Sequence, residues 1–143
     1  MTHRTIHIRS WRVDVFIEDN ATAPYNLQGH FKEMDEVIDC LIGIGANDDI
    51  VEKAGRMLFE EHPNQAFTYS NGRRTCIYIG WTTSGEEFLN SMIHEIRHLV
   101  DHIAAFYGLD NNEAVGYISG DAALLLAEDI CEHGCPHCRK EEI

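Results

Sequence analysis

The chain has 143 residues, 44% hydrophobic and 24% charged, which are proportions typical of a single soluble globular domain. Its 24 acidic residues outnumber its 11 lysines and arginines, and the resulting formal charge of −13 argues against nucleic acid or an anionic membrane as partner. The longest purely apolar run, residues 122–127, is too short to span a bilayer, and the N-terminal segment lacks the apolar stretch of a signal peptide. Five cysteines, an odd number, fit a reducing compartment, so we expect a soluble cytoplasmic protein.

The first half of the chain predicts strands followed by two helices. Apolar and polar residues alternate over residues 5–17 with a change of phase near Ser10, which predicts one bulged strand or two short strands. The arginines in and before this segment are interpreted as the solvated face of an edge strand. Apolar residues at helical spacing predict a helix over residues 31–42, and a second helix begins at a cap formed by Asn47 or Asp48. We expect both helices to pack on the core and assign them no chemistry.

The second half predicts a hairpin and two long helices. Residues 67–69 and 75–79 flank an Asn-Gly pair, which is the strongest short signal for a β-hairpin. A capping box at Ser84 starts a helix that ends at Gly108. A short turn then leads to a last helix over residues 112–131. This last helix is apolar over much of its circumference, and we expect it to be well buried against the preceding helix.

These elements predict an α+β fold in the order β-α-α-β-β-α-α. We expect one small domain over residues 1–130, with a short, mainly antiparallel sheet and a Cys/His-rich tail over residues 131–143.

The helix that begins at Ser84 contains the sequence His94-Glu95-x-x-His98. Residues four apart share one face of a helix, so the two imidazoles can bind a single zinc ion, with Glu95 beside them to transfer protons. The apolar residues of this helix fall on the opposite side, which favours a pair of histidines facing a cleft over a buried core pair. The alternative interpretation is two surface histidines that bind no metal.

A catalytic zinc ion usually has three protein ligands and a water molecule, so a third ligand is expected. Glu113 is the favoured candidate, because an antiparallel helical hairpin would bring the start of the next helix back beside the metal helix. Its alternative role is that of a carboxylate stabilised by the helix dipole. Four other groups remain candidates: Asp101, His102, Asp110 and Asp121. For Asp101, an outer hydrogen bond to a ligating histidine is the more plausible role.

These residues resemble the zincin metallopeptidases, and among them the gluzincins, in which His-Glu-x-x-His on one helix precedes a glutamate ligand on the next. The match consists of His94, Glu95, His98 and Glu113 and covers about a quarter of the chain. The chain is also similar to small zincin-type proteins of phages and mobile elements. The resemblance implies a zincin-like domain that holds Zn²⁺ through two histidines and a glutamate and acts on a peptide or protein substrate.

The expected reaction is hydrolysis of a peptide bond. Zinc lowers the pKa of bound water to about 7, and Glu95 acts as general base and then passes the proton to the leaving amine. Tyr117, one turn after Glu113, is the candidate donor to the developing oxyanion. The resemblance further implies that the strand over residues 75–79 offers a free edge to an extended peptide.

Two alternatives stay open. The tail residues Cys131, Cys135, His137 and Cys138 could form a second, structural zinc site, or they could be free thiols and an unliganded imidazole. The His94–His98 pair could belong to a non-catalytic zinc-binding protein that uses the metal for structure or interaction. A fourth protein ligand, His102 or Asp121, would favour that second role.

Overall fold

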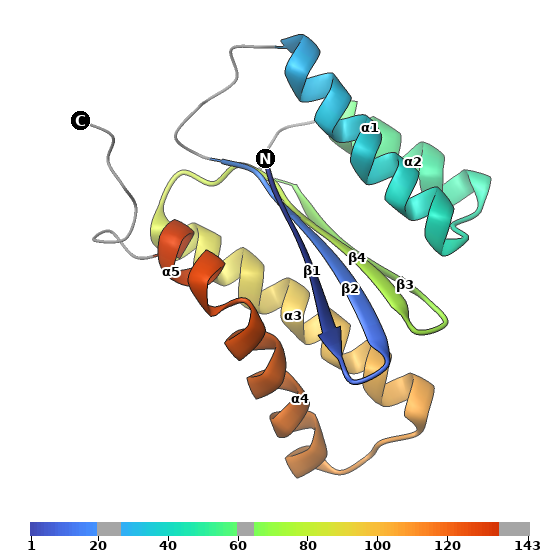
Figure 1. Ribbon diagram of the computed structural model, residues 1–143, viewed down its shortest axis with the longest axis vertical. Helices are drawn as coiled ribbons and strands as arrows, with labels where there is room; N and C mark the ends of the chain where they lie inside the picture. Colours follow the sequence, from blue (N-terminus) through green and yellow to red (C-terminus); the bar gives the residue numbers. More distant parts are fainter. Residues whose placement is uncertain (20–26, 60–64, 135–143) are drawn as a thin grey trace.

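The structure is a computed structural model that describes residues 1–19, 27–59 and 65–134 (Figure 1). In chain order its elements are β1 (Thr2–Ile8), β2 (Trp11–Ile17), α1 (Leu27–Ile44), α2 (Asp48–Phe59), β3 (Ala66–Asn71), β4 (Arg74–Ile79), α3 (Gly85–Tyr107), α4 (Asn112–Leu125) and α5 (Ala127–Gly134). The α+β class is confirmed.

The four strands form one sheet in the order β1-β2-β4-β3. The β1–β2 and β3–β4 pairs are antiparallel, whereas β2 and β4 run parallel, so the sheet is mixed. Helices α1 and α2 lie on one side of the sheet, and α3, α4 and α5 lie on the other (Figure 1). In this three-layer arrangement β1 and β3 are the two edges of the sheet.

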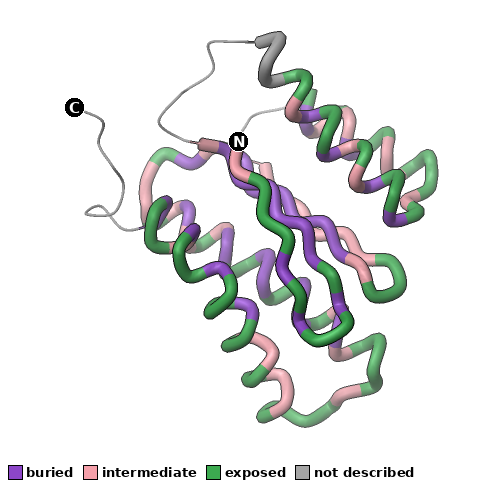
Figure 2. Tube along the Cα trace, in the orientation of Figure 1, coloured by how far each residue is buried: buried purple, intermediate pink, exposed green. Residues whose placement is uncertain are grey.

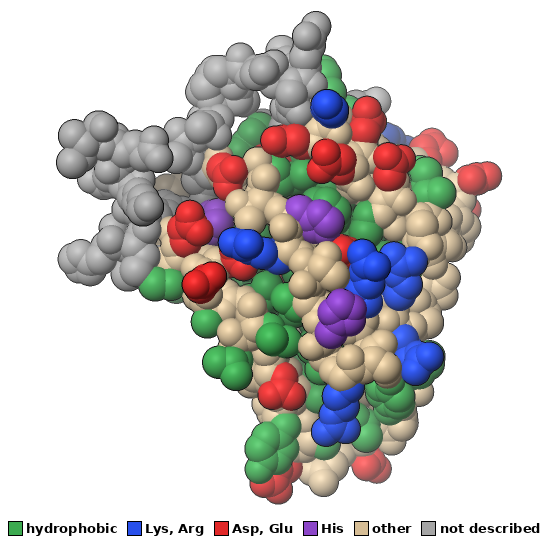
Figure 3. Space-filling view, in the orientation of Figure 1, with side chains coloured by type: hydrophobic (Ala, Val, Ile, Leu, Met, Phe, Trp, Pro, Cys, Tyr) green, Lys and Arg blue, Asp and Glu red, His purple; other side chains and the backbone are tan. Residues whose placement is uncertain are grey.

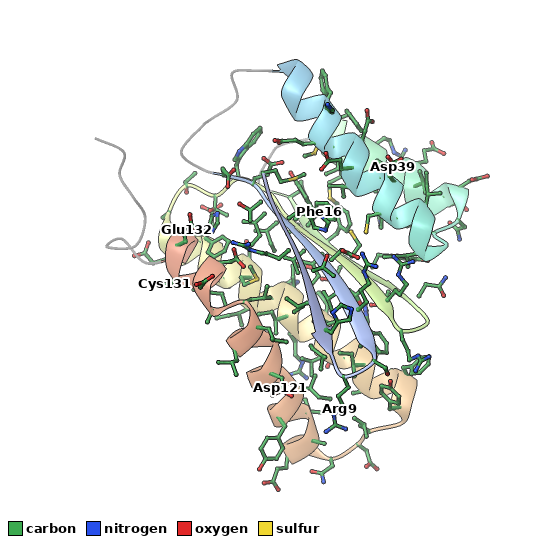
Figure 4. The ribbon with its side chains drawn as sticks, in the orientation of Figure 1. Arg9, Phe16, Asp39, Asp121, Cys131 and Glu132 are labelled. Carbon is green, nitrogen blue, oxygen red and sulfur yellow. The ribbon has the colours of Figure 1, made fainter. Side chains whose placement is uncertain are left out.

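Two apolar cores fill the spaces between the layers, because alternate residues of β2 and β4 point to opposite faces. Val13, Val15 and Ile17 pack with Ile77 and Ile79 against α3. On the other face, Phe16, Cys76 and Tyr78 pack against α1 and α2. Phe16 is seen between the sheet and α1 in Figure 4, and the purple central strands of Figure 2 show how completely the middle of the sheet is buried.

Residues 5–17 form two strands, one of the two arrangements expected. The connection at Arg9 and Ser10 is tight, and Arg9 adopts a positive φ of 56°. The second hairpin turns at Gly72, whose φ is 61°. One expectation about this region is wrong: β4 has paired strands on both sides, so residues 75–79 offer no free edge, and on that side of the sheet the edge strand is β3. The sequence pattern identifies the hairpin but not which of its strands joins β2.

Helix α3 has the limits that its local sequence predicts. The side chain of Ser84 accepts a hydrogen bond from the Glu87 amide at 3.1 Å. At the other end Gly108 adopts the left-handed conformation, and its amide lies within bonding range of the carbonyl groups of Ala104 and Ala105. Both ends of the helix that carries the histidines are therefore fixed by caps.

The helix predicted over residues 112–131 is divided at Leu126 into α4 and α5. The expectation that it is well buried is wrong for α4, in which only Ala122 is fully buried while Tyr117 and Leu124 are 69% and 74% exposed. The helix packs against α3, β1 and α5, and its residues at the core, Val115, Ile118 and Ala122, are spaced so that they share one face. Helix α5 includes residues 130 and 131, between which the sequence-based boundary of domain and tail lies. None of the helices in the described ranges is both long and apolar enough to cross a membrane.

The basic residues of the first hairpin lie on the edge strand β1 and its neighbour. Arg4 forms an ion pair with Asp129 of α5 at 3.0 Å, and Arg12 forms one with Asp14 at 3.2 Å. Figure 3 shows basic and acidic side chains interspersed on this face of the molecule. This arrangement agrees with a solvated edge strand for β1, whereas Arg12 lies on the interior strand β2.

Candidate active site

A cavity of about 480 Å³ opens beside the edge strand β3, between α2 and α3. Its wall on the α3 side carries His94, Glu95, His98 and His102. The other lining residues come from α1, α2 and β3: Leu41, Ile50, Lys53, Ala54, Met57, Ala66, Phe67, Thr68 and Tyr69. The three histidines and Glu95 are thus brought together at one edge of the sheet, in a cavity of the size that small ligands occupy.

The two histidines of the motif are oriented towards each other. The Nε2 atoms of His94 and His98 are 3.0 Å apart, and their rings meet at 80°. Two nitrogen ligands at about 2.05 Å from a tetrahedral zinc ion are roughly 3.3 Å apart, so the observed pair needs to open by only a few tenths of an ångström. The same separation also permits a hydrogen bond between two neutral imidazoles. The donor types and spacing fit two ligands of one zinc ion.

Glu95 is only 4% exposed, although it is a charged residue type. Thr68 of β3 donates a hydrogen bond to Glu95 Oε1 at 3.0 Å, and the same hydroxyl is 3.3 Å from the Glu95 carbonyl oxygen. A buried carboxylate normally needs such partners. Thr68 therefore fixes Glu95 at the junction of α3 and β3, beside the two histidines.

His102 lies one turn after His98, and the two ring centroids are 6.4 Å apart. Its Nδ1 is 2.6 Å from the hydroxyl oxygen of Ser70 on β3. Burial, followed by the nearby His98, lowers the pKa of His102 from its ordinary value, and Asp101 opposes this shift. A lowered pKa keeps His102 neutral at pH 7, so it can donate one hydrogen bond and accept another.

The structure does not bring Glu113 together with the motif. In the described part of the chain, no group of three or more His, Cys, Asp and Glu side chains is placed to hold a metal ion. Glu113 lies in the first turn of α4, close to Tyr107, the last residue of α3. Tyr107 is nine positions after His98, a rise of roughly 13 Å along the helix, so Glu113 starts far from the histidine pair. Moreover, α4 contacts α3 and β1, the edge of the sheet opposite β3.

The other candidate residues lie outside this cavity. Asp101 forms an exposed ion pair with Arg97 at 3.0 Å. Asp121 lies on α4 (Figure 4), as does the exposed Tyr117, and neither lines the cavity. Asp110 lies between α3 and α4 and is exposed. Of the five candidate third ligands, His102 is the one that lines the cavity.

Most of the proposed second zinc site lies outside the described residues. Cys135, His137 and Cys138 are among residues 135–143, which the structure does not describe. Of the four proposed ligands it describes only Cys131, which is exposed on α5 (Figure 4). Nearby, His133 Nδ1 is 2.9 Å from the carbonyl oxygen of Asp129, and its Nε2 is 3.6 Å from Asp19. Both ring nitrogens of His133 are thus close to oxygen atoms of other residues.

Sequence reasoning missed the contribution of α2. The helical spacing of Ile50, Ala54 and Met57 predicts core residues, but these side chains also line the cavity opposite the histidines. Lys53 is the one lysine or arginine among the lining residues. Thr68 was missed too, because a threonine in a strand carries no signal of its own before its neighbour on α3 is known.

Comparison of the chain with protein-family models, with curated proteins and with solved structures finds no match. The resemblance to zincins therefore depends on the motif residues and their spacing.

Proposed function

We propose that this protein is a zinc-dependent peptidase that hydrolyses peptide bonds, with Glu95 as general base. The observation that carries the proposal is the 3.0 Å separation of His94 Nε2 and His98 Nε2 in a cavity that also contains the buried Glu95. His94 and His98 would hold the metal. Zinc would supply an activated water molecule and polarise the carbonyl group of the substrate.

Glu95 is oriented for proton transfer. Because Thr68 donates to Oε1, that oxygen is occupied, whereas Oε2 has no hydrogen-bond partner in the part of the chain that the structure describes. Oε2 is therefore the atom that takes the proton from the attacking water and passes it to the leaving amine nitrogen. Burial of the carboxylate excludes bulk water from this transfer.

The substrate in this proposal is an extended peptide that lies along β3. An edge strand has backbone N–H and C=O groups without partners in the sheet, and an added strand can bond to them. The cavity lies against this edge, with α2 on one side and the histidines on the other. Its apolar wall of Ile50, Ala54 and Met57 favours an apolar side chain next to the cleaved bond.

A purely structural zinc site is less well supported by the geometry. Structural zinc sites are closed by four protein ligands, usually drawn from more than one element. Here the two paired histidines come from one helix, and within the described ranges no further acidic, cysteine or histidine side chain completes a group of three. With two ligands in place, a structural site would lack two protein ligands and a catalytic site would lack one.

The test compares zinc content and peptide cleavage in the wild type and three variants. Wild-type protein is expected to contain about one zinc per chain at this site and to cleave members of a peptide library, detected by mass spectrometry. Glu95→Gln should retain zinc and lose turnover at least 100-fold, because the general base is removed. His98→Ala should lose zinc and activity together.

Glu86→Gln is the matched control, since Glu86 is an exposed carboxylate in the first turn of the same helix. It should behave as wild type. The proposal fails if purified protein binds no zinc, or if Glu95→Gln cleaves peptides at the wild-type rate. Glu113→Gln answers the separate question of the third ligand: retained zinc excludes Glu113, and lost zinc would require α4 to move relative to α3.

A further inference from the structure

A chain of hydrogen bonds crosses the sheet and ends at His102. Trp11 Nε1 of β2 donates to Thr75 Oγ1 of β4 at 2.8 Å. Thr75 Oγ1 is 2.7 Å from Ser70 Oγ of β3, and Ser70 Oγ is 2.6 Å from His102 Nδ1 of α3. Trp11 and Thr75 are 1% and 0% exposed, so solvent does not compete for the first two members.

The buried end of this chain sets the direction of its first two bonds. An indole N–H can only donate, so Thr75 Oγ1 accepts from Trp11. The hydroxyl proton of Thr75 then needs an acceptor, and in the described part of the chain Ser70 Oγ is the acceptor within reach. If Ser70 donated to Thr75 instead, the Thr75 proton would be buried without a partner, which proteins strongly avoid.

With its oxygen accepting from Thr75, Ser70 still has its own proton to donate, and in the described part of the chain His102 Nδ1, 2.6 Å away, is the acceptor within reach. When Ser70 donates to it, that nitrogen is unprotonated, and in a neutral imidazole the proton is then on Nε2. Within the described residues Nε2 of His102 has no hydrogen-bond partner, while the side chain lines the same cavity as His94, Glu95 and His98.

We infer that the Trp11–Thr75–Ser70 chain holds His102 in the tautomer with the proton on Nε2, which makes His102 a hydrogen-bond donor into the cavity and not the third metal ligand. A nitrogen that carries a proton has no free lone pair for zinc. The assignment of the tautomer depends only on the hydrogen bonds. The role that follows from it rests on the proposed peptidase function.

In that role His102 Nε2–H donates to the carbonyl oxygen of the substrate as negative charge develops there. A donor fixed in advance by Ser70 stabilises the oxyanion without reorganisation during the reaction. Tyr117 was the sequence-based candidate for this donor, but it is exposed on α4 and does not line the cavity. Ser70 is a positioning residue, since it acts through His102.

The first test reads the tautomer directly. The full chain, ¹⁵N-labelled at histidine, is examined by two-bond ¹H–¹⁵N correlation spectra at a pH where His102 is neutral, both metal-free and after addition of zinc. We expect His102 to show protonated Nε2 and unprotonated Nδ1 in both samples. Protonated Nδ1, or an Nε2 signal shifted by zinc as for a ligand, would overturn the assignment.

The second test separates a donor from a ligand. His102→Leu is expected to retain zinc and lose kcat about 100-fold, the effect of removing one oxyanion donor. His102→Gln keeps an N–H group near the Nε2 position and should recover part of that loss. Loss of zinc in His102→Leu would identify a ligand, and an unchanged rate would eliminate the donor role.

Ser70→Ala tests the positioning step, with Ser119→Ala of α4 as the control. Ser119 donates to the Val115 carbonyl at 2.9 Å, far in the fold from the cavity. Ser70→Ala should mix the two tautomers of His102 and lower kcat with little change in KM. A wild-type tautomer and rate in Ser70→Ala would contradict the chain. If no peptide is cleaved by any variant, the proposed function fails, whereas the tautomer is still decided by the spectra.

Discussion

Glu18→Gln is expected to stabilise the protein at pH 8 but not at pH 4. Glu18 directly follows β2 and is 3% exposed, and Tyr78 donates to its Oε1 at 3.3 Å. Burial raises the pKa of Glu18 from 4.5 to about 7. In the unfolded chain the carboxyl group is solvated and titrates near the lower value.

The magnitude follows from linkage between protonation and folding. Between pH 4.5 and 7 the folded state binds more protons at Glu18 than the unfolded state, so its stability falls as pH rises through that window. A difference of about 2.5 pKa units corresponds to roughly 3 kcal/mol, at 1.36 kcal/mol per unit. Glutamine is neutral at every pH and retains an oxygen that can accept from Tyr78. The variant should therefore match wild type near pH 4 and exceed it by about 3 kcal/mol near pH 8.

The assay is urea unfolding of both proteins at several pH values, with the difference in unfolding free energy plotted against pH. Tyr78→Phe, alone and combined with Glu18→Gln, measures how much of the effect passes through the hydrogen bond. An equal difference at pH 4 and pH 8 would show that the gain has another origin. No difference at pH 8 would refute the reasoning, because it would mean that burying the charged carboxylate costs nothing.

Four further predictions concern the start of α3, a solvent-facing glycine of α4 and the cavity. Gly85→Ala should cost about 2–3 kcal/mol in thermal unfolding because its methyl group would overlap the backbone carbonyl of Gly134, whereas Gly116→Ala, with open space around it, should gain up to 1 kcal/mol. Ser84→Ala should cost about 1 kcal/mol by loss of the N-cap, and an unchanged melting temperature would contradict that role. Lys53→Glu should disfavour cleavage of peptides with acidic residues by roughly fivefold in kcat/KM, with zinc content unchanged; an unaltered peptide preference would exclude Lys53 from substrate contact.

Features specified by neighbouring residues could be predicted from the sequence. The limits of α3 depend on Ser84 at one end and Gly108 at the other, and both act through backbone groups within a few residues. The start of α2 is similar, since Asn47 Oδ1 accepts from the Ile50 amide at 2.9 Å. The tight turn at Gly72 likewise follows from the Asn-Gly pair.

Features that depend on packing between distant segments could not be predicted. The α3–α4 connection shows that the two helices run antiparallel, but not on which side of α3 the second helix lies. Apolar residues of β1 and α4, such as Ile6 and Ala122, decide this by joining one core. That contact places Glu113 towards the β1 edge, while His94 and His98 lie at the β3 edge. The spacing of these residues in the sequence does not indicate at which edge of the sheet Glu113 lies.

The division of roles among elements favours a catalytic site over a structural one. The paired histidines and Glu95, the proposed general base, lie on α3, a helix capped at both ends, whereas the opposite wall of the cavity belongs to α2. The hydrogen-bond partners of Glu95 and His102 are Thr68 and Ser70, which lie two residues apart on the edge strand β3 and so point to the same face of the sheet. A site that only held the fold together would need its ligands spread over these elements. Here β3 supplies hydrogen bonds that orient the side chains of α3, and within the described residues its outer edge has no neighbouring strand, so the proposed peptide substrate would bind beside them.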